Sequence, residues 1–159
     1  MKIKPVYNWI KNNLPNNCLL CLASPDEMQS DICHACLADL PWQQTCCARC
    51  ALPLPHASTR CGRCLARPPA FCHAVVPLLY RFPLDALIPA FKYRRHNRYG
   101  LLLARLLADH LQQHLAEPEA LIPELLVPIP MHPKRQAQRS YNQAFELTRD
   151  LAGALHLPC

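Results

Sequence analysis

The chain has 159 residues, a formal net charge of +6 and 51% hydrophobic residues, with 17 prolines but only 3 glycines. A chain of this length forms one ordinary domain or two small ones. Its first residues are too polar for a secretory leader, and no apolar run reaches the length that spans a membrane. We therefore expect a soluble protein of the cytoplasm.

Residues 1–17 are expected to form a short helix or a loose lead-in. The Cys-x-x-Cys turns that follow come in two pairs, with eleven residues between the turns of the first pair and ten in the second. One such turn places two sulfurs at adjacent corners of a tetrahedron, and a second turn supplies the other two corners. The pattern predicts two structural Zn²⁺ ions, bound by Cys18, Cys21, Cys33 and Cys36 and by Cys47, Cys50, Cys61 and Cys64.

Other uses of these cysteines fit the pattern less well. A disulfide framework is typical of an oxidising compartment and an even cysteine number, whereas this chain has eleven cysteines. Iron–sulfur clusters use other spacings, and a redox-active pair does not need four copies. The ligand identities stay open at the edges, because Cys46 adjoins Cys47 and because His34 and His56 are alternative nitrogen donors.

The basic residues concentrate in the middle of the chain. Residues 46–105 contain ten lysines and arginines and one acidic residue, Asp85, whereas the flanking segments have more acidic than basic residues. Part of this charge offsets the negative charge of a zinc–thiolate unit, since Arg49, Arg60 and Arg63 lie in the second site's loops. Charge confined in this way is typical of a surface that faces nucleic acid, phosphate groups or an acidic partner.

The composition changes after the stiff connector RPPA at residues 67–70, which is the predicted domain boundary. The apolar run at 74–80 has the length of a strand, and Pro77 places that strand at the edge of a sheet. Apolar residues then follow at helical spacing over 84–91, where Pro89 interrupts them.

The second half of this region repeats the order of strand and helix. A strong helix is predicted over 100–115, with one apolar stripe of leucines at positions 103, 106, 107 and 111. The run LLVPIP at 125–130 predicts a short buried strand, and MHPKRQAQRSYNQ after it predicts a basic loop. An amphipathic helix is predicted over 143–156.

Strand, helix, strand and helix in this order predict an α/β domain with parallel strands over residues 70–159. It would follow a small, metal-stabilised double zinc-ribbon region at residues 1–69. Two strands cannot bury the faces of two helices, because a doubly wound sheet needs about four or more. We therefore expect that the chain is a fragment or that a partner supplies the rest.

Several independent motifs occur in a fixed order along the chain. They are the two four-cysteine units, Cys61-Gly62-Arg63-Cys64 with Pro68-Pro69, Lys92-Tyr93-Arg94, and Val127-Pro128-Ile129-Pro130 followed by Arg135, Arg139, Tyr141, Asn142 and Gln143. Together they resemble the ComF/GntX family of bacterial proteins over nearly the whole chain. The resemblance implies an N-terminal zinc-ribbon region, a C-terminal domain similar to type I phosphoribosyltransferases, and an association with natural competence and the use of external DNA.

The sequence departs from this family at two places. Ser140 stands where the family usually has glycine, which restricts the backbone of that turn. The family's Asp-Asp-Val-x-Thr-Thr-Gly loop, which would hold the ribose phosphate of PRPP and help place Mg²⁺, does not occur in the sequence. We therefore expect that the chain is truncated before this loop, and we expect PRPP and Mg²⁺ only with the complete transferase domain.

In a phosphoribosyltransferase, pyrophosphate would bind in the loop between the second strand and its helix. The resemblance therefore implies an anion-binding role for Lys134, Arg135, Arg139 and Asn142. The residues agree with this role, because a helix N-terminus attracts anions and guanidinium groups grip phosphate oxygens. Without the resemblance, a solvated basic loop would be the simpler interpretation.

The segment KYRRHNRY is a candidate for contact with nucleic acid. Its basic side chains would contact phosphates, and a tyrosine would stack on bases. The residues concerned are Lys92, Tyr93, Arg94, Arg95, Arg98 and Tyr99. A solvated helix end is an equally good interpretation. No histidine pairs with a carboxylate at a spacing that indicates acid–base catalysis, so the sequence assigns no catalytic residue.

The sequence thus predicts a ComF/GntX-like zinc protein of the cytoplasm, implicated in DNA uptake or utilisation and carrying a phosphoribosyltransferase-like domain. Its expected partners are single-stranded DNA and proteins of the DNA-uptake machinery. Two alternatives stay open. One is an enzyme that transfers a phosphoribosyl group from PRPP to an acceptor, and the other is a non-catalytic zinc adaptor that binds single-stranded DNA or a protein.

Overall fold

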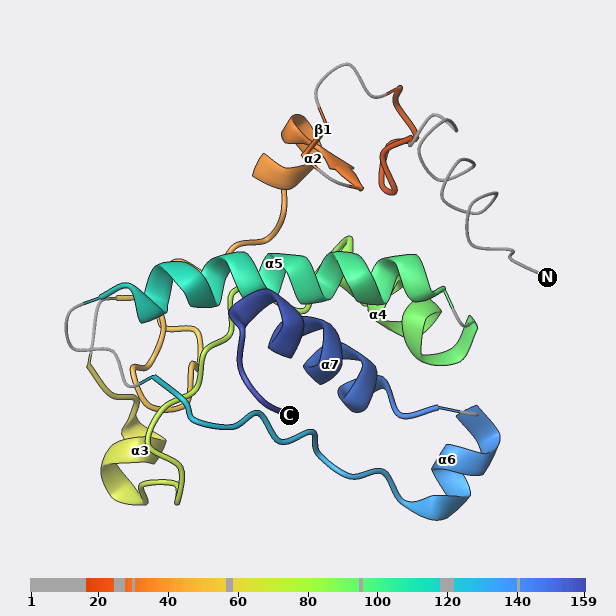
Figure 1. Cartoon of the computed structure of the whole chain (residues 1–159). Coiled ribbons are helices and arrows are strands. Elements are labelled where there is room, and N and C mark those ends of the chain that lie inside the picture. The colour runs from red at the N-terminus through yellow and green to blue at the C-terminus, as the bar shows by residue number, and fades with distance from the viewer. Residues whose placement is uncertain are drawn as a thin grey trace. The chain divides into compact units, whose positions relative to one another are not determined.

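The computed structural model describes residues 17–24, 28–29, 31–56, 59–94, 96–117, 122–139 and 141–159. They fall into two compact units, one ending at Asp39 and the other beginning at Leu40. The first unit contains β1 (Met28–Gln29), β2 (Ile32–Cys33) and α2 (His34–Ala38), and the second contains α3 (Gly62–Ala66), α4 (Leu84–Arg94), α5 (Asn97–Leu115), α6 (Pro133–Arg139) and α7 (Gln143–Leu155) (Figure 1). The helix or lead-in expected before Asn17 lies outside the described residues.

The first unit has a very small described core. Its strands β1 and β2 pair antiparallel, with Met28 opposite Cys33 and Gln29 opposite Ile32. Among its described residues, the buried side chains are Cys18 and Ile32. Burial of two side chains contributes little to stability, so we expect metal binding to stabilise this part of the chain.

Helix α5 is the centre of the second unit's helical part, because both α7 and α4 pack against it (Figure 1). The prediction of this helix is confirmed, although it begins three residues earlier, at Asn97. Leu102 and Leu106 are buried, while Leu103 and Leu107 line a cavity of about 390 Å³ that α4 and α7 share. Among the described helices, none combines the length and apolar character needed to cross a membrane.

Helix α4 runs through Pro89 and ends at Arg94, so proline does not interrupt it. Proline within a helix removes one backbone hydrogen bond and crowds the preceding turn. Here the buried side chains of Leu84, Leu87 and Phe91 hold the helix on both sides of Pro89. Tertiary packing therefore outweighs the local preference of the sequence.

The strand predicted at 74–80 does not form, and this prediction is wrong. Leu78 makes only an isolated antiparallel bridge with Trp42. The Gln43 N–H donates to Pro77 O at 2.8 Å, and the Leu79 N–H donates to Pro41 O at 2.9 Å. Residues just before the second zinc site thus hold the segment in place. No second strand of a parallel sheet lies beside it in the described part of the chain.

The buried strand predicted at 125–130 is also wrong. The segment is not a strand, and Leu125, Val127 and Ile129 are 55%, 74% and 79% exposed. Its Pro128 and Pro130 have no N–H with which to continue a ladder. The Leu126 N–H donates to Pro158 O at 2.9 Å, which joins this segment to the residues after α7.

The segment predicted as a basic loop contains helix α6, so that prediction is wrong for residues 133–139. Pro133 occupies its first position, where proline's fixed φ favours a helix and its missing N–H costs nothing. The N–H groups of Arg135 and Gln136 donate to His132 O. The helix predicted next is confirmed as α7, which Asn142 caps by accepting a hydrogen bond from the Ala144 N–H at 3.0 Å.

Candidate metal centres and basic surface

Two groups of four cysteines bring their sulfurs together, and they contain the eight cysteines that the spacing indicates. Within each group, all four sulfur atoms lie within 4.8 Å of one another. Zinc–sulfur bonds of 2.3 Å place the sulfurs of a regular tetrahedron about 3.8 Å apart. The Sγ atoms of Cys21 and Cys33 are 3.7 Å apart, and so are those of Cys50 and Cys61. The geometry therefore fits two structural zinc ions.

Both centres are built by the same backbone device. Leu22 and Ala51 each follow the second cysteine of the first turn, and both have positive φ, at 61° and 56°. Their N–H groups donate to Cys18 O and Cys47 O at 3.0 and 2.8 Å. This left-handed conformation turns the chain back around the metal position, at a cost of about 1–2 kcal/mol that glycine would avoid.

The second turn of each centre begins a short helix. Cys33 precedes α2 and Cys61 precedes α3, with ψ angles of 159° and 161° at these N-cap positions. The backbone N–H of Cys33 donates to Cys18 Sγ at 3.4 Å, and that of Cys61 donates to Cys47 Sγ at 3.3 Å. Such N–H···S contacts orient a metal-binding thiolate and stabilise its charge.

These contacts separate the thiols of each centre by acidity. Burial opposes ionisation of Cys18, but N–H groups of Cys21, Cys33 and Leu20 outweigh it and lower the pKa of Cys18 to about 6. Hydrogen bonds from the backbone of Cys50 and Cys61 likewise lower the pKa of Cys47 to about 6, against burial. Each centre thus contains a thiol whose ionised form the surrounding backbone stabilises before zinc binds.

Cys36 and Cys64 occupy matching positions and behave in the opposite way. Burial and hydrogen bonds to the other cysteines raise the pKa of Cys36 well above its usual range and that of Cys64 to about 12. Zinc must therefore displace the protons of these thiols as it binds. Metal binding to both centres consequently weakens as the pH falls.

The two centres differ in burial. In the second, Cys47, Cys61 and Cys64 are buried together and Leu54 packs against them. In the first, only Cys18 is buried, and Cys21 is exposed. Solvent and competing ligands therefore reach the first centre more easily.

We expect a chelator to remove zinc from this protein in two steps, with one ion released faster than the other. A competing chelator dye would measure the release. The fast step should disappear in Cys36→Ser and persist in Cys64→Ser, whose first centre keeps all four cysteines. A single release rate, or loss of the fast step in Cys64→Ser alone, would contradict this order.

The alternative ligands lie outside both clusters. Cys46 is half-buried and pairs with Pro53 through a backbone bridge, while His34 and His56 are exposed. Neither histidine nor Cys46 belongs to a group of ligand atoms close enough to hold a metal in the described residues. All eleven cysteines are described, and none forms a disulfide.

Arg49 connects the second zinc centre to the proline connector. It lies inside the Cys47–Cys50 turn, and its guanidinium donates to Pro69 O at 2.8 Å. Its buried Nε atom has no hydrogen-bond partner among the described residues. The predicted connector at 67–70 therefore lies within the second unit, and the division of the chain at residues 69 and 70 stays a prediction.

The predicted nucleic-acid-binding residues cluster where α4 ends and α5 begins. Lys92, Arg94 and Arg98 are exposed, and Tyr93 is 68% exposed. Tyr99 is half-buried, with its ring 5.3 Å from that of His96. Arg95 lies outside the described residues.

A second exposed aromatic–basic group precedes α4, and the sequence analysis did not identify it. Tyr80 and Phe82 are 66% and 79% exposed, and Arg81 between them is exposed as well. Exposed apolar side chains that lie together can mark a binding site. The alternation of aromatic, basic and aromatic residues is the signal that could have revealed this group.

The predicted anion-binding residues divide between α6 and the start of α7. Lys134 and Arg135 are exposed on α6. Arg139 ends that helix, and its side chain lies outside the description. Asn142 has a structural role, because its Oδ1 atom caps α7 and its Nδ2 atom donates to Ile129 O at 3.3 Å.

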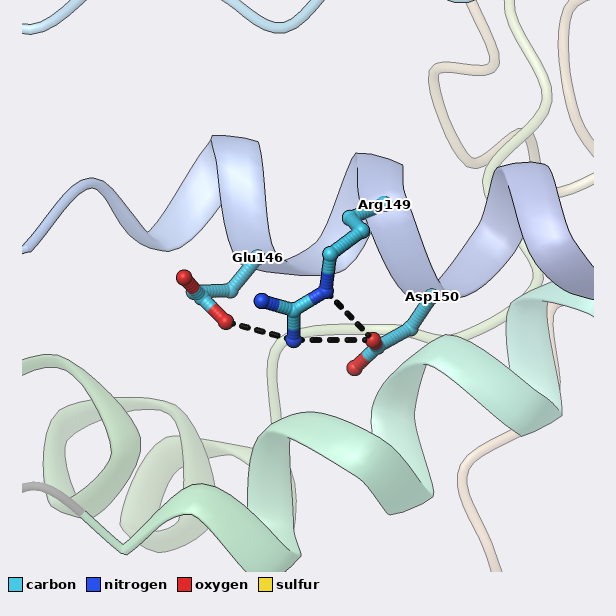
Figure 2. A network of polar contacts seen from close by, with 3 residues as sticks. All are labelled: Glu146, Arg149 and Asp150. Carbon is cyan, nitrogen blue, oxygen red and sulfur yellow. Dashed lines mark hydrogen bonds and ion pairs between the residues drawn. The ribbon is translucent and has the colours of Figure 1, made fainter. Parts of the chain in front are cut away.

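Arg149 on α7 is neutralised by two acidic neighbours. Its guanidinium lies between Glu146 and Asp150, at 2.6 and 3.0 Å from their oxygens (Figure 2). The hydrogen bonds that Arg149 donates to Asp150, with the charges of both carboxylates, raise the pKa of Arg149. This exposed group contributes little to stability, and it keeps one arginine out of the basic surface.

Comparison with known proteins agrees with the metal centres. Residues 10–65 match the family model of a double zinc ribbon domain. The chain is 32% identical over 94 residues to Competence protein F of Haemophilus influenzae. These 94 residues are 59% of this chain and 41% of that protein. The chain thus matches less than half of this relative's length, and no solved structure matches it significantly. The chain therefore contains a double zinc ribbon with two structural zinc sites, and these matches support its resemblance to the ComF family.

Proposed function

We propose that this protein is a ComF-like zinc protein of the cytoplasm that acts in DNA uptake or utilisation by binding single-stranded DNA. The name of its relative, Competence protein F, supports the link to competence. None of its eleven cysteines forms a disulfide, which suits a reducing compartment. The observation that carries the binding role is the presence of exposed aromatic and basic side chains at both ends of α4.

These two ends have the composition of a single-strand binding surface. Tyr80, Arg81 and Phe82 precede the helix, and Lys92, Tyr93 and Arg94 complete it. Proteins that bind single strands combine cations, which contact the phosphates, with aromatic rings, on which the bases stack. In a duplex the bases already stack on one another, so exposed rings favour a single strand.

The distance between the two groups suits a short oligonucleotide. Helix α4 has 11 residues, which corresponds to a length of about 16 Å. A single strand of a few nucleotides can span this length, within the sites of about 4–16 nucleotides that single-strand-binding domains use. One strand could therefore stack on both groups.

We expect the double variant Tyr80→Ala/Phe82→Ala and the variant Tyr93→Ala each to bind single-stranded DNA more weakly. Loss of one stacked base costs about 1–3 kcal/mol, which corresponds to roughly 5-fold to 150-fold in affinity. Fluorescence anisotropy with a labelled oligothymidylate would measure this. Phe71→Ala is the matched control, because Phe71 is 49% exposed but lies outside both groups.

The basic residues should act differently from the rings. Arg81→Ala with Arg94→Ala should reduce the slope of log affinity against log salt by about 0.7 per lost phosphate contact. Affinity and slope that stay unchanged in all these variants would exclude the binding surface. The exposed basic residues would then fit the footprint of an acidic protein, as in a zinc adaptor.

We also propose that residues 70–159 are the first part of a phosphoribosyltransferase-like α/β domain. Neither the segment before α6 nor the one after α7 is a strand in this structure, but the hydrogen bond from the Leu126 N–H to Pro158 O supports the proposal because it joins these two segments. Lys134 and Arg135 on α6 would hold the anionic group of the ligand. Binding of PRPP and transfer of its phosphoribosyl group belong to this proposal.

A further inference from the structure

Two basic segments that are far apart in the sequence meet at the end of α4. The Tyr141 hydroxyl donates a hydrogen bond to Phe91 O, and Gln143 Nε2 donates to Lys92 O at 3.3 Å. Both acceptors are carbonyls in the last turn of α4. The residues between α6 and α7 are thereby attached to the basic end of α4.

Two residues of this attachment are buried, and Tyr141 is half-buried. Phe91 is 3% exposed and Gln143 is 4% exposed. The Tyr141 ring meets the edge of the Phe91 ring, with centroids 6.0 Å apart. A buried amide such as that of Gln143 must keep its hydrogen-bond partner, since an unsatisfied one costs about 1–3 kcal/mol.

The attachment brings the backbone just before Tyr141 close to the end of α4. Arg94 follows Lys92 by two residues, and Arg139 precedes Tyr141 by two. Since consecutive Cα atoms lie 3.8 Å apart, each of these pairs spans at most about 8 Å. The end of α6 and the end of α4 therefore both lie near the hydrogen bonds that Tyr141 and Gln143 donate.

The same hydrogen bonds reduce the repulsion between the end of α4 and an anion. The last carbonyls of a helix carry partial negative charge and repel phosphate. Tyr141 and Gln143 donate to two of these carbonyls and so offset that charge where Lys92 and Arg94 lie. Neither 92–99 nor 131–143 contains an acidic residue.

We propose that the end of α4 and helix α6 form one continuous phosphate-binding surface, which takes a single strand of DNA across both. Its charged residues are Lys92, Arg94, Lys134 and Arg135, all of them exposed. Tyr141 and Gln143 are its positioning residues, since they fix the two segments to each other without contacting the ligand. This inference rests on the proposed binding of single-stranded DNA.

The test compares two double variants, Lys92→Ala/Arg94→Ala and Lys134→Ala/Arg135→Ala, with an oligothymidylate of about 12 nucleotides. Each pair should lower the salt slope by about 1.4, because each removes two phosphate contacts. Titration of the native chain should give one oligonucleotide per chain. Two per chain, or an unchanged slope for the Lys134/Arg135 pair while the Lys92/Arg94 pair lowers it, would overturn the continuous surface and leave the proposed function standing.

Tyr141→Phe tests the positioning role separately. It removes the hydroxyl but keeps the ring against Phe91, so the affinity should fall by about 2-fold to 10-fold, as for one lost hydrogen bond. The salt slope should not change, because no phosphate contact is lost. A wild-type affinity in a folded Tyr141→Phe variant would overturn the positioning role. Failure of the native chain to bind the oligonucleotide would overturn the proposed DNA binding and this inference with it.

Discussion

Cys64→Ser is expected to remove one zinc ion and to unfold much of the chain beyond Leu40, whereas Cys36→Ser removes the other ion and leaves the helices folded. The two cysteines occupy matching positions in their centres. Only the second centre lies in the compact unit that contains α4, α5 and α7. The two variants therefore differ in how much of the fold depends on the zinc ion that each one loses.

The contacts around the second centre explain this dependence. Arg49 holds Pro69 O, Gln43 Nε2 donates to Ala51 O at 2.9 Å, and the Gln43 N–H donates to Pro77 O. The zinc turn thus fixes the segment that leads into α4. A structural zinc contributes about 10–16 kcal/mol in peptide models, which is as large as the net stability of about 5–15 kcal/mol of a whole domain.

Zinc analysis and the helical circular dichroism signal, followed during heating, would test the pair of variants. Cys46→Ser is the control, since Cys46 lies outside both clusters and its replacement should leave two zinc ions and the native melting curve. Equal melting curves for Cys36→Ser and Cys64→Ser would show that the helices do not depend on the second centre.

The second large effect is expected at the junction of α4, α5 and α7. Phe91→Ala should lower the free energy of unfolding by about 3–5 kcal/mol, because a buried aromatic ring is lost and a cavity remains. Gly100→Ala should lower it by about 1–3 kcal/mol through overpacking. A Cβ atom at Gly100 would overlap Cε2 of Phe91, whose ring is confined by Tyr141.

Urea denaturation of the single and double variants would measure these changes. In the double variant, Gly100→Ala should cost much less than by itself, because its clashing partner is gone. Gly153→Ala in α7 is the matched control, since its Cβ would have no heavy atom within 4 Å apart from its chain neighbours and the backbone of its own helix. It should stabilise the helix by about 0.5–1 kcal/mol. A Gly100→Ala variant as stable as Gly153→Ala would contradict the packing argument.

The zinc centres could be predicted from sequence because their chemistry is local. Four cysteines in two short turns determine most of the geometry, and their spacing is visible without the fold. The helices α5 and α7 could be predicted for a similar reason, since apolar residues at helical spacing bury one face. Their predicted limits differ from the observed ones by three residues or fewer.

The two strand predictions are wrong because a strand forms only where a neighbouring strand can pair with it, and composition does not show that. The runs at 74–80 and 125–130 have suitable composition, but their hydrogen bonds go to Pro41 and Pro158 rather than to a sheet. Sequence also could not show that Tyr141 and Gln143 cap α4, because their partners are about 50 residues away. The sequence shows only that Tyr141 and Gln143 fit the family's motif, whereas the structure shows which atoms they contact.

The exposed segment at 125–130 affects how this protein behaves at high concentration. Leu125, Val127 and Ile129 lie at alternate positions of an extended chain, a pattern that lets strands of different molecules stack into aggregates. Pro128 and Pro130 alternate with them, and proline cannot donate to a growing ladder. We therefore expect the two prolines to act as gatekeepers, which keep this exposed apolar segment from seeding fibrils.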